Sequence, residues 1–232
     1  MTCGDSAPMP VVRSGAAWVV IDKPADLLSV PGRGPDKQDC TVSRVKAMFP
    51  EATGPMVVHR LDMDTSGLML VALDAPVQRT LSMQFESRTI EKQYEAIVQG
   101  EPAQRAGEIR LRQRLDVDHR PLQILDEAQG KLAVTRWRFV ESASACDWPP
   151  ARTEQASVFS RIVFSPITGR SHQLRLAAAT LAPIGLGCPI VGDDLYGAGK
   201  PIGGRLLLAA TRLAFDDPAT GERIDVARSA PF

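Results

Sequence analysis

The sequence predicts an α+β fold built on a mixed, largely antiparallel sheet that is flanked by helices and loops. Short runs of apolar and β-branched residues recur along the chain, whereas apolar residues at helical spacing occupy only a few segments. Strands and helices do not alternate regularly, as a doubly wound parallel sheet would require. The 232 residues, of which 44% are hydrophobic and 23% charged, suit one large domain or two small ones.

The first half of the chain has clear start and stop signals for its predicted elements. Asp39 and Asp74 are the expected N-caps of two helices, and Pro50 ends the first of them. A proline in the first turn also favours the second helix. In chain order we predict a strand over 16–24, a helix over 39–50, strands over 56–59 and 68–73, and a helix over 74–90.

The second half is richer in strands and has one further helix. Its elements are predicted as a strand over 93–100, hairpin arms and loops over 105–130, strands over 132–141 and 157–166 with a loose loop between them, a helix over 168–182, a strand pair or one bent strand over 205–215, and a turn over 217–222. We expect residues 1–14 to form a disordered lead and residues 15–232 to form a single domain.

Composition excludes several classes of protein. The longest apolar run, 174–187, contains an arginine and a proline, so we expect no membrane span. The N-terminus has neither the basic start nor the apolar core of an export signal, and the four cysteines form no CxxC pair, so we expect a cytoplasmic chain with reduced thiols. With three histidines a Cys/His metal site has little support. A net charge of zero does not decide whether the partner is anionic.

One charged segment lies between two of the predicted strands. It reads HRLDMDTSG over residues 59–67. A turn explains its Asp, Ser and Gly, but it explains neither His59 nor Arg60. Taken alone, Asp62 fits a turn or cap residue more often than a catalytic carboxylate. Both interpretations stay open on these nine residues.

The motifs together resemble the RluA family of pseudouridine synthases. HRLDMDTSG is similar to the family's active-site motif, and DKPADLLSVPGR, KQYEAIVQG, PITGRSHQLR, CPIVGDDLYG and RLLLAATRLAF follow in the family's order. The resemblance covers the chain from about Trp18 onward. It implies the pseudouridine synthase fold with a central RNA-binding cleft, formed by one catalytic domain over 15–232 without an appended N-terminal RNA-binding domain, as in the stand-alone members of the family.

The resemblance also implies an activity and a substrate. The expected reaction is isomerisation of uridine to pseudouridine in structured RNA, without a cofactor or metal, by a monomer. The expected targets are the anticodon stem-loop of tRNA, a hairpin of 23S rRNA, or both, recognised largely by folded shape. Neither DNA nor a membrane is an expected partner.

Three residues are expected to perform the chemistry. A carboxylate can attack a sugar or stabilise an oxocarbenium-like centre, which is the role implied for Asp62. By the resemblance, Arg175 forms an ion pair with Asp62 and keeps it ionised and oriented. Tyr94 can stack on uracil and move a proton with its hydroxyl. Whether Asp62 attacks the sugar or the base stays open, as does the group that removes the final proton.

Further residues are expected to contact RNA. Arg60 is expected to fill the space that a flipped-out uridine leaves. His59 is expected to bond to backbone or phosphate and to hold the turn. Arg170, His172 and Gln173 lie near a predicted helix start, where backbone phosphate is readily bound.

The chain departs from the family pattern at a few places. Asp26 replaces a usual glycine, and Ala177 and Ala209 replace two usual histidines that we expect to pack together in relatives. The segment after Arg175 is also longer by a short insertion, which bears on substrate fit.

Two competing functions are considered. DMDTS matches the nucleophile motif of haloacid-dehalogenase-type phosphatases, but His59 and Arg60 stand where that fold requires a buried apolar strand. A non-catalytic RNA-binding relative is the second alternative.

Overall fold

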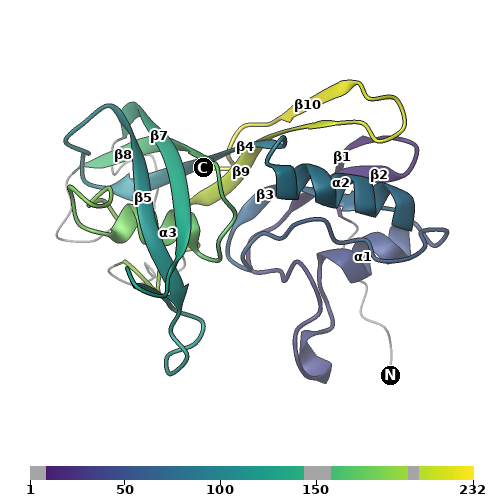
Figure 1. The fold of residues 1–232 in the computed structure, drawn as a ribbon, viewed down its shortest axis with the longest axis horizontal. Coiled ribbons are helices and arrows are strands. Elements are labelled where there is room, and N and C mark those ends of the chain that lie inside the picture. The colour runs from purple at the N-terminus through teal and green to yellow at the C-terminus, as the bar shows by residue number, and fades with distance from the viewer. Residues whose placement is uncertain (1–8, 144–157, 198–203) are drawn as a thin grey trace. The chain divides into compact units, whose positions relative to one another are not determined.

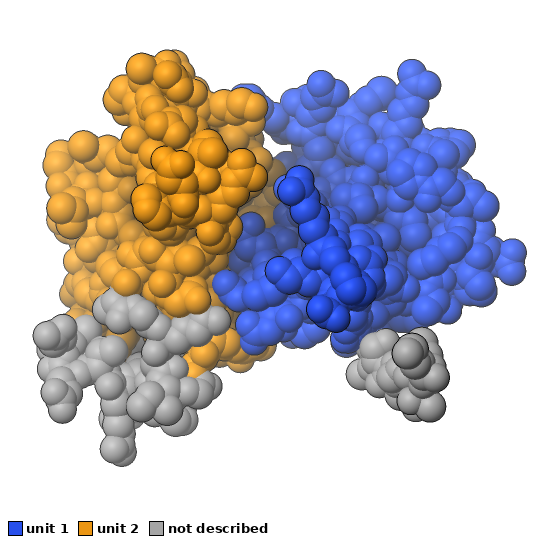
Figure 2. Space-filling model, turned by 90° about the horizontal axis from the view of Figure 1, so that it is seen from below, with its two compact units in different colours: residues 1–91, 210–229 blue, residues 92–209, 230–232 orange. Residues whose placement is uncertain are grey.

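The chain forms two compact units (Figures 1 and 2). This computed structural model describes residues 9–143, 158–197 and 204–232. Unit 1 consists of residues 1–91 and 210–229, and unit 2 of residues 92–209 and 230–232. The expectation of a single catalytic domain over 15–232 stays a prediction. The chain passes from one unit to the other in the middle of a strand, after Ala209, and also after Glu91 and Ser229.

Unit 1 is a mostly antiparallel arrangement of strands with two α-helices. Its strands are β1 (Val11–Ser14), β2 (Trp18–Lys23), β3 (Ser66–Ala72), most of β9 (Leu208–Asp216) and β10 (Arg223–Ala227), and its helices are the short η1 (Pro35–Lys37), α1 (Thr41–Met48) and α2 (Ala75–Ser87). β2 pairs with β1 and β3, and β10 pairs with β9, all antiparallel. β1 lies in the lead that we predicted to be disordered, so that prediction is wrong for residues 11–14.

The core of unit 1 is formed by β2, β3 and the apolar face of α2. All residues of β3 are buried, and Leu81 is the buried residue of α2. Trp18 packs edge-on against Phe215 with ring centroids 4.9 Å apart, and its indole nitrogen donates to Asp217 at 2.9 Å. A buried tryptophan thus keeps its polar atom bonded, as burial requires.

The caps of the two α-helices show where local sequence signals hold and where they do not. Asp74 caps α2 as predicted, accepting from the amide of Val77 at 2.8 Å. α1 is capped by Cys40 rather than by Asp39. The carboxylate of Asp39 instead binds Arg44 through two contacts, at 2.7 and 2.6 Å. An arginine one turn away therefore competes successfully with the helix terminus for this carboxylate.

Unit 2 is a strongly twisted antiparallel sheet with one helix. Its elements are β4 (Glu91–Gln99, whose first residue belongs to unit 1), β5 (Ala106–Leu115), β6 (Gln123–Leu125), β7 (Lys131–Ala143), β8 (Phe159–Pro166) and α3 (Gln173–Ala179). The strand order is β4–β8–β7–β5–β6. Every residue of α3 from Gln173 to Ala178 is buried, and its apolar residues join one core cluster with those of β4, β5, β7 and β8. That cluster fixes the position of α3.

Several further predictions are corrected. Residues 56–59 form no strand; a single bridge joins Val57 to Val71. β10 was not predicted, because only Ile224 and Val226 of its five residues are buried. α3 begins at Gln173 instead of 168. Most of the loose loop predicted between the two strands lies outside the described residues. Within the described parts of the chain, no helix combines the length and apolarity needed to cross a bilayer.

Candidate functional site

The turn around Asp62 in unit 1 is held on both sides through its backbone. The amide of Thr65 donates to the carbonyl of Asp62 at 3.1 Å and closes the turn. Before the turn, the hydroxyl of Ser29 donates to the carbonyl of Leu61 at 2.6 Å and accepts from the amide of Leu61 at 3.0 Å. After Asp62, the carbonyl of Met63 accepts from a buried lysine at 2.9 Å. The side chain of Asp62 is half-buried.

That lysine is Lys23, the last residue of β2. It is fully buried, and its ammonium donates to three carbonyls, those of Pro24 at 2.9 Å, Leu27 at 2.6 Å and Met63 at 2.9 Å. Burial lowers the pKa of Lys23 from 10.5 to about 8, while the negative charge of Asp62 is the largest of the neighbouring charges that act in the opposite direction. At neutral pH a positive charge therefore lies behind the turn, and Lys23 and Asp62 attract each other.

His59 and Gly67 frame the same segment. Nε2 of His59 accepts from the amide of Leu70 at 2.9 Å, and the ring stacks on Phe85 with centroids 4.6 Å apart. This is a backbone contact of the kind that we expected of His59, and its contact with RNA stays a prediction. Gly67 has a φ of +107°, and a Cβ there would lie 2.2 Å from the carbonyl oxygen of Ala210, so only glycine fits.

Packing and backbone bonding thus account for much of the HRLDMDTSG segment. Thr65 and Ser66 are buried, whereas Arg60 is exposed. Among the described residues of unit 1, no hydrogen bond reaches the carboxylate oxygens of Asp62. Arg60 and the carboxylate of Asp62 are therefore two groups of this motif that the described residues of unit 1 leave available for chemistry or binding.

Unit 2 holds Arg175 in a buried ion pair. Arg175 is 2% exposed, and Asp193, which is 1% exposed, binds it through Nε at 2.9 Å and Nη2 at 2.6 Å. Asp194 lies 3.2 Å from Nη2, and the guanidinium lies 5.6 Å from the ring centroid of Tyr196. Asp193 also accepts from the amides of Leu195 and Tyr196 at 3.0 and 3.1 Å. The head group is enclosed, as the apolar context of Arg175 suggested.

Sequence reasoning missed Asp193, Asp194 and Tyr196 as partners of Arg175. All three lie in the segment GDDLYG, which we quoted as a family motif without assigning a role to its acids. Two adjacent carboxylates shortly after a buried arginine were the signal that could have found them.

The start of α3 is fixed by side chains that we expected to contact RNA. His172 has left-handed backbone (φ 52°), and its Nδ1 lies 2.9 Å from the hydroxyl of Tyr196. That hydroxyl accepts from the amide of Gln123 at 2.7 Å. Arg170 donates from Nε to the carbonyl of Leu132 at 3.1 Å, which leaves the rest of its guanidinium available for other contacts.

Gln173 has a structural role instead of the RNA contact that we predicted. It is 4% exposed, and its Oε1 accepts from the hydroxyl of Thr168 at 2.8 Å and from the amide of Arg170 at 2.9 Å. Its Nε2 donates to the carbonyl of Val134 and to the hydroxyl of Thr135, both at 3.0 Å. Because the amide is fully bonded inside unit 2, Gln173 has no atom to offer to RNA.

The remaining predicted residues fall in both units. Tyr94, in β4, is half-buried, packs against the core cluster of unit 2 and lies opposite Phe164 of β8. Asp62, His59 and Arg60 belong to unit 1, and Tyr94 and Arg175 to unit 2. The ion pair between Asp62 and Arg175 would join the two units and stays a prediction.

Ala177 and Ala209 are both buried in unit 2, and the pairing that we expect of the corresponding histidines in relatives also stays a prediction. Among the described residues, no cluster of His, Cys, Asp and Glu is suited to hold a metal.

Comparison with known proteins defines the class. Residues 17–180 match the family model of the RNA pseudouridylate synthases. The chain belongs to this family, and it is an isomerase that converts uridine to pseudouridine in RNA. The alternative interpretation of DMDTS as a phosphatase motif is therefore wrong.

The similarity extends to curated relatives and to solved structures. The chain is 38% identical over 216 residues to the dual-specificity RNA pseudouridine synthase RluA of Escherichia coli (strain K12), covering 92% of this chain and 90% of that protein. It is 39% identical over 215 residues to the protein of the same name from Haemophilus influenzae, with coverage of 92% and 89%. The structure of human RNA pseudouridylate synthase domain containing 1 matches with a TM-score of 0.76 at 25% identity, covering 100% of this chain and 87% of that one.

Proposed function

We propose that this enzyme, as a monomer, modifies a uridine in the anticodon stem-loop of tRNA, one in a hairpin of 23S rRNA, or both. The term dual-specificity in the names of relatives that cover nine-tenths of the chain supports more than one target. In the reaction the bond between N1 of uracil and C1′ of ribose breaks, and a bond between C5 and C1′ forms. The C5 proton leaves and N1 takes up a proton, so the change is an isomerisation that consumes no other reagent.

Asp62 is the proposed nucleophile or charge stabiliser. The single observation that supports this role most strongly is the way its turn is built. The peptide is fixed by Ser29, Lys23 and Thr65, while no hydrogen bond from the described residues of unit 1 reaches its carboxylate. A reacting group needs a fixed position and an available lone pair, and this arrangement provides both. Arg175 is the proposed partner that orients the carboxylate, and Tyr94 the proposed group that stacks on uracil and transfers a proton.

Arg60 is the proposed residue that takes the place of the flipped base. Its side chain is exposed and follows His59, whose ring is held by Leu70 and Phe85. A long cation on a rigid support can enter an RNA loop and contact phosphate, and extruding the base costs roughly a few kcal/mol.

Tritium release tests the catalytic assignment. RNA hairpins with the sequence of a tRNA anticodon stem-loop or of 23S rRNA are labelled at C5 of uridine, and release is measured for wild type, Asp62→Ala and Asp36→Ala. Asp36 is an exposed carboxylate of the same unit and serves as the matched control. We expect Asp36→Ala to behave as wild type and Asp62→Ala to fall by roughly 10⁴-fold or more, as for loss of a nucleophile. Release by Asp62→Ala near the wild-type rate would overturn the assignment.

Mapping identifies the target. Carbodiimide reactivity in total RNA, compared between cells with and without the gene, should lose a signal in tRNA, in 23S rRNA, or in both. Loss of a signal only in another RNA would show that the proposed targets are wrong.

The proposal that the enzyme is a monomer has its own test. The mass in solution, measured by light scattering, should be that of one chain.

A further inference from the structure

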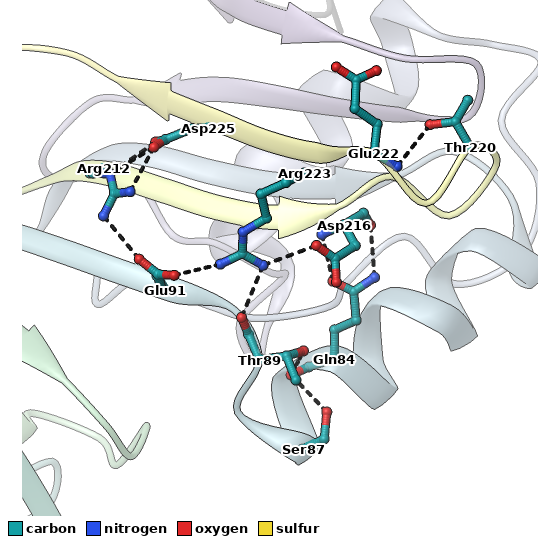
Figure 3. Close-up of polar contacts among 10 residues, drawn as sticks. All are labelled: Gln84, Ser87, Thr89, Glu91, Arg212, Asp216, Thr220, Glu222, Arg223 and Asp225. Atoms are coloured by element: carbon teal, nitrogen blue, oxygen red, sulfur yellow. Dashed lines mark hydrogen bonds and ion pairs between the residues drawn. The ribbon is translucent and has the colours of Figure 1, made fainter.

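The end of α2 and the start of β4 are fastened to the β9–β10 hairpin by polar contacts within unit 1 (Figure 3). The side-chain amide of Gln84 bonds both backbone groups of Asp216, donating to its carbonyl at 2.8 Å and accepting from its amide at 2.9 Å. Arg223 donates from Nη1 to the carbonyl of Thr89 and to the carboxylate of Asp216, both at 3.2 Å. The last turn of α2, at Gln84, and the connection to β4, at Thr89, are thus each tied to the hairpin.

Glu91, the first residue of β4, is bound by two arginines of this hairpin (Figure 3). One of its carboxylate oxygens accepts from Arg212 at 3.1 Å and the other from Arg223 at 2.9 Å. Arg212 is itself held by Asp225 through Nε at 3.0 Å and Nη2 at 2.6 Å, a contact that raises the pKa of the guanidinium. We call Glu91, Arg212, Arg223, Asp216 and Asp225 the β4 clamp.

The charge of the β4 clamp distinguishes it from an RNA-binding patch. Two guanidiniums are bonded to three carboxylates, so the cluster has no excess positive charge to offer to phosphate. Its contacts link elements that are distant in sequence: Arg212 and Glu91 are 121 residues apart, and Arg223 and Glu91 are 132 apart. Such a network fixes the geometry of the chain rather than binding a ligand.

The clamp lies at the start of β4, before the described register between β4 and β8 begins. α2 ends at Ser87, its C-cap residue Arg88 has left-handed backbone (φ 62°), and β4 begins at Glu91. The described register between β4 and β8 begins only at Tyr94, opposite Phe164. β8 therefore supports β4 from Tyr94 onward, and the clamp fixes the strand three residues earlier.

We propose that Glu91, held by Arg212 and Arg223, is a positioning residue for Tyr94. The inference rests on the catalytic role proposed for Tyr94. An extended strand transmits a rotation at one residue to the side chains that follow, and a displacement of about 1 Å at a reacting group can cost up to 10²-fold in rate. Because the pairs are exposed at the surface, they add little to stability, so their loss affects mainly geometry.

Unit 2 offers a matched control for this proposal. Glu108 is also an exposed glutamate bound by two arginines, Arg110 at 2.9 Å and Arg136 at 3.2 Å. Glu91→Gln and Glu108→Gln therefore remove the same charge from the same kind of cluster. We expect Glu91→Gln to lower kcat about tenfold with KM for RNA changed less than about twofold. Glu108→Gln should leave kcat unchanged, and the two variants should melt within a few degrees of each other.

Two further variants separate positioning from folding. Arg223→Lys retains the charge and should keep more of kcat than Arg223→Met. The double variant Glu91→Gln/Arg223→Met should be no slower than the slower single variant, because residues that act as one unit show non-additive effects. Additive losses of kcat would contradict the proposal. It would also be contradicted if the loss of kcat in Glu91→Gln occurred only at temperatures where the variant begins to unfold.

Failure of this inference is distinguishable from failure of the proposed function. If Tyr94→Phe abolishes activity while Glu91→Gln matches Glu108→Gln in kcat, only the inference is wrong. If Tyr94→Phe is fully active, the role proposed for Tyr94 fails and the inference fails with it, while the assignment of Asp62 still stands on its own test.

Discussion

The two units each hold a charged side chain of the proposed active site, and they hold it in opposite ways. In unit 1 the turn of Asp62 is fixed through neighbouring backbone groups, by Ser29 and by the buried cation Lys23. In unit 2 the guanidinium of Arg175 is fixed directly, by the buried anion Asp193. Each unit therefore buries an ion of opposite charge, Lys23 in unit 1 and Asp193 in unit 2. Lys23 bonds to the backbone beside Asp62, whereas Asp193 bonds to the guanidinium of Arg175 itself.

The difference matches what each group is proposed to do. A carboxylate that attacks carbon needs an available lone pair, so its turn is best fixed without occupying all of its own oxygen lone pairs. An arginine that orients a partner keeps its charge in any case, and its planar head group can serve two partners at once. Fixing the backbone suits the first role, and fixing the head group suits the second.

The largest expected effect on stability concerns the anion of unit 2. Asp193→Asn removes the charge that compensates buried Arg175, and breaking a buried pair in this way costs about 3–5 kcal/mol. Urea denaturation measures the loss. Asp39→Asn is the control, because it removes an exposed contact to Arg44 and should cost less than about 1 kcal/mol. Equal losses in the two variants would show that Arg175 does not depend on Asp193.

The cation of unit 1 should give a pH-dependent stability. In the folded chain Lys23 loses its proton near pH 8, whereas in the unfolded chain it keeps the proton up to about pH 10.5. Between these values the unfolded state binds more protons, so the free energy of unfolding rises with pH, by about 3 kcal/mol over the window. Lys23→Met should lack this increase. Urea unfolding of both proteins from pH 8 to pH 10.5 checks it, and a difference that stays constant with pH would contradict the interpretation.

Ser29 offers a test of the backbone contacts on their own. Ser29→Ala leaves the amide and the carbonyl of Leu61 without their partner in a buried place, which costs about 2 kcal/mol or more. Turnover should fall as well, because the turn of Asp62 loosens. Ser87→Ala removes an exposed serine that bonds within α2 and should change both quantities little. If Ser29→Ala destabilises the fold but leaves kcat intact, the turn does not need this anchor for catalysis.

The smallest effect is expected at the second carboxylate beside Arg175. Asp194 is 39% exposed in its side chain and contacts Nη2 at the longer distance of 3.2 Å. Asp194→Asn should therefore cost less than about 1 kcal/mol in urea denaturation. A loss as large as that of Asp193→Asn would show that the two acids share the charge of Arg175 equally.

Much of the fold could be predicted from local signals, and the exceptions have physical causes. The cap of α2 at Asp74 was predicted from the local signal, and its carboxylate accepts from the amide of Val77 as that signal requires. The cap of α1 was not, because Arg44 binds Asp39 and leaves the cap to Cys40. β1 was missed because none of its four residues is buried, and β10 because its alternation is only five residues long; pairing with β2 and β9 defines them.

The candidate site, too, has residues that the sequence indicated and supporting groups that it did not. The sequence proposed Asp62, Tyr94 and Arg175 through motifs in a family order, and it predicted that His59 bonds to backbone or phosphate. It did not identify the groups that hold them. Lys23 and Met63 are 40 residues apart, Ser29 and Leu61 are 32 apart, and Arg175 and Asp193 are 18 apart. No local pattern links such pairs.

By itself, the sequence determined the family, the reaction class and the segment that holds the carboxylate proposed to react, because these depend on the types of residues and their order. Only the tertiary structure decided that Gly67 must be glycine, that Gln173 is an internal support, and which buried ion faces each unit's charged group. The physical reason is that close approach, burial and hydrogen bonding depend on distances between segments that the order of residues does not contain.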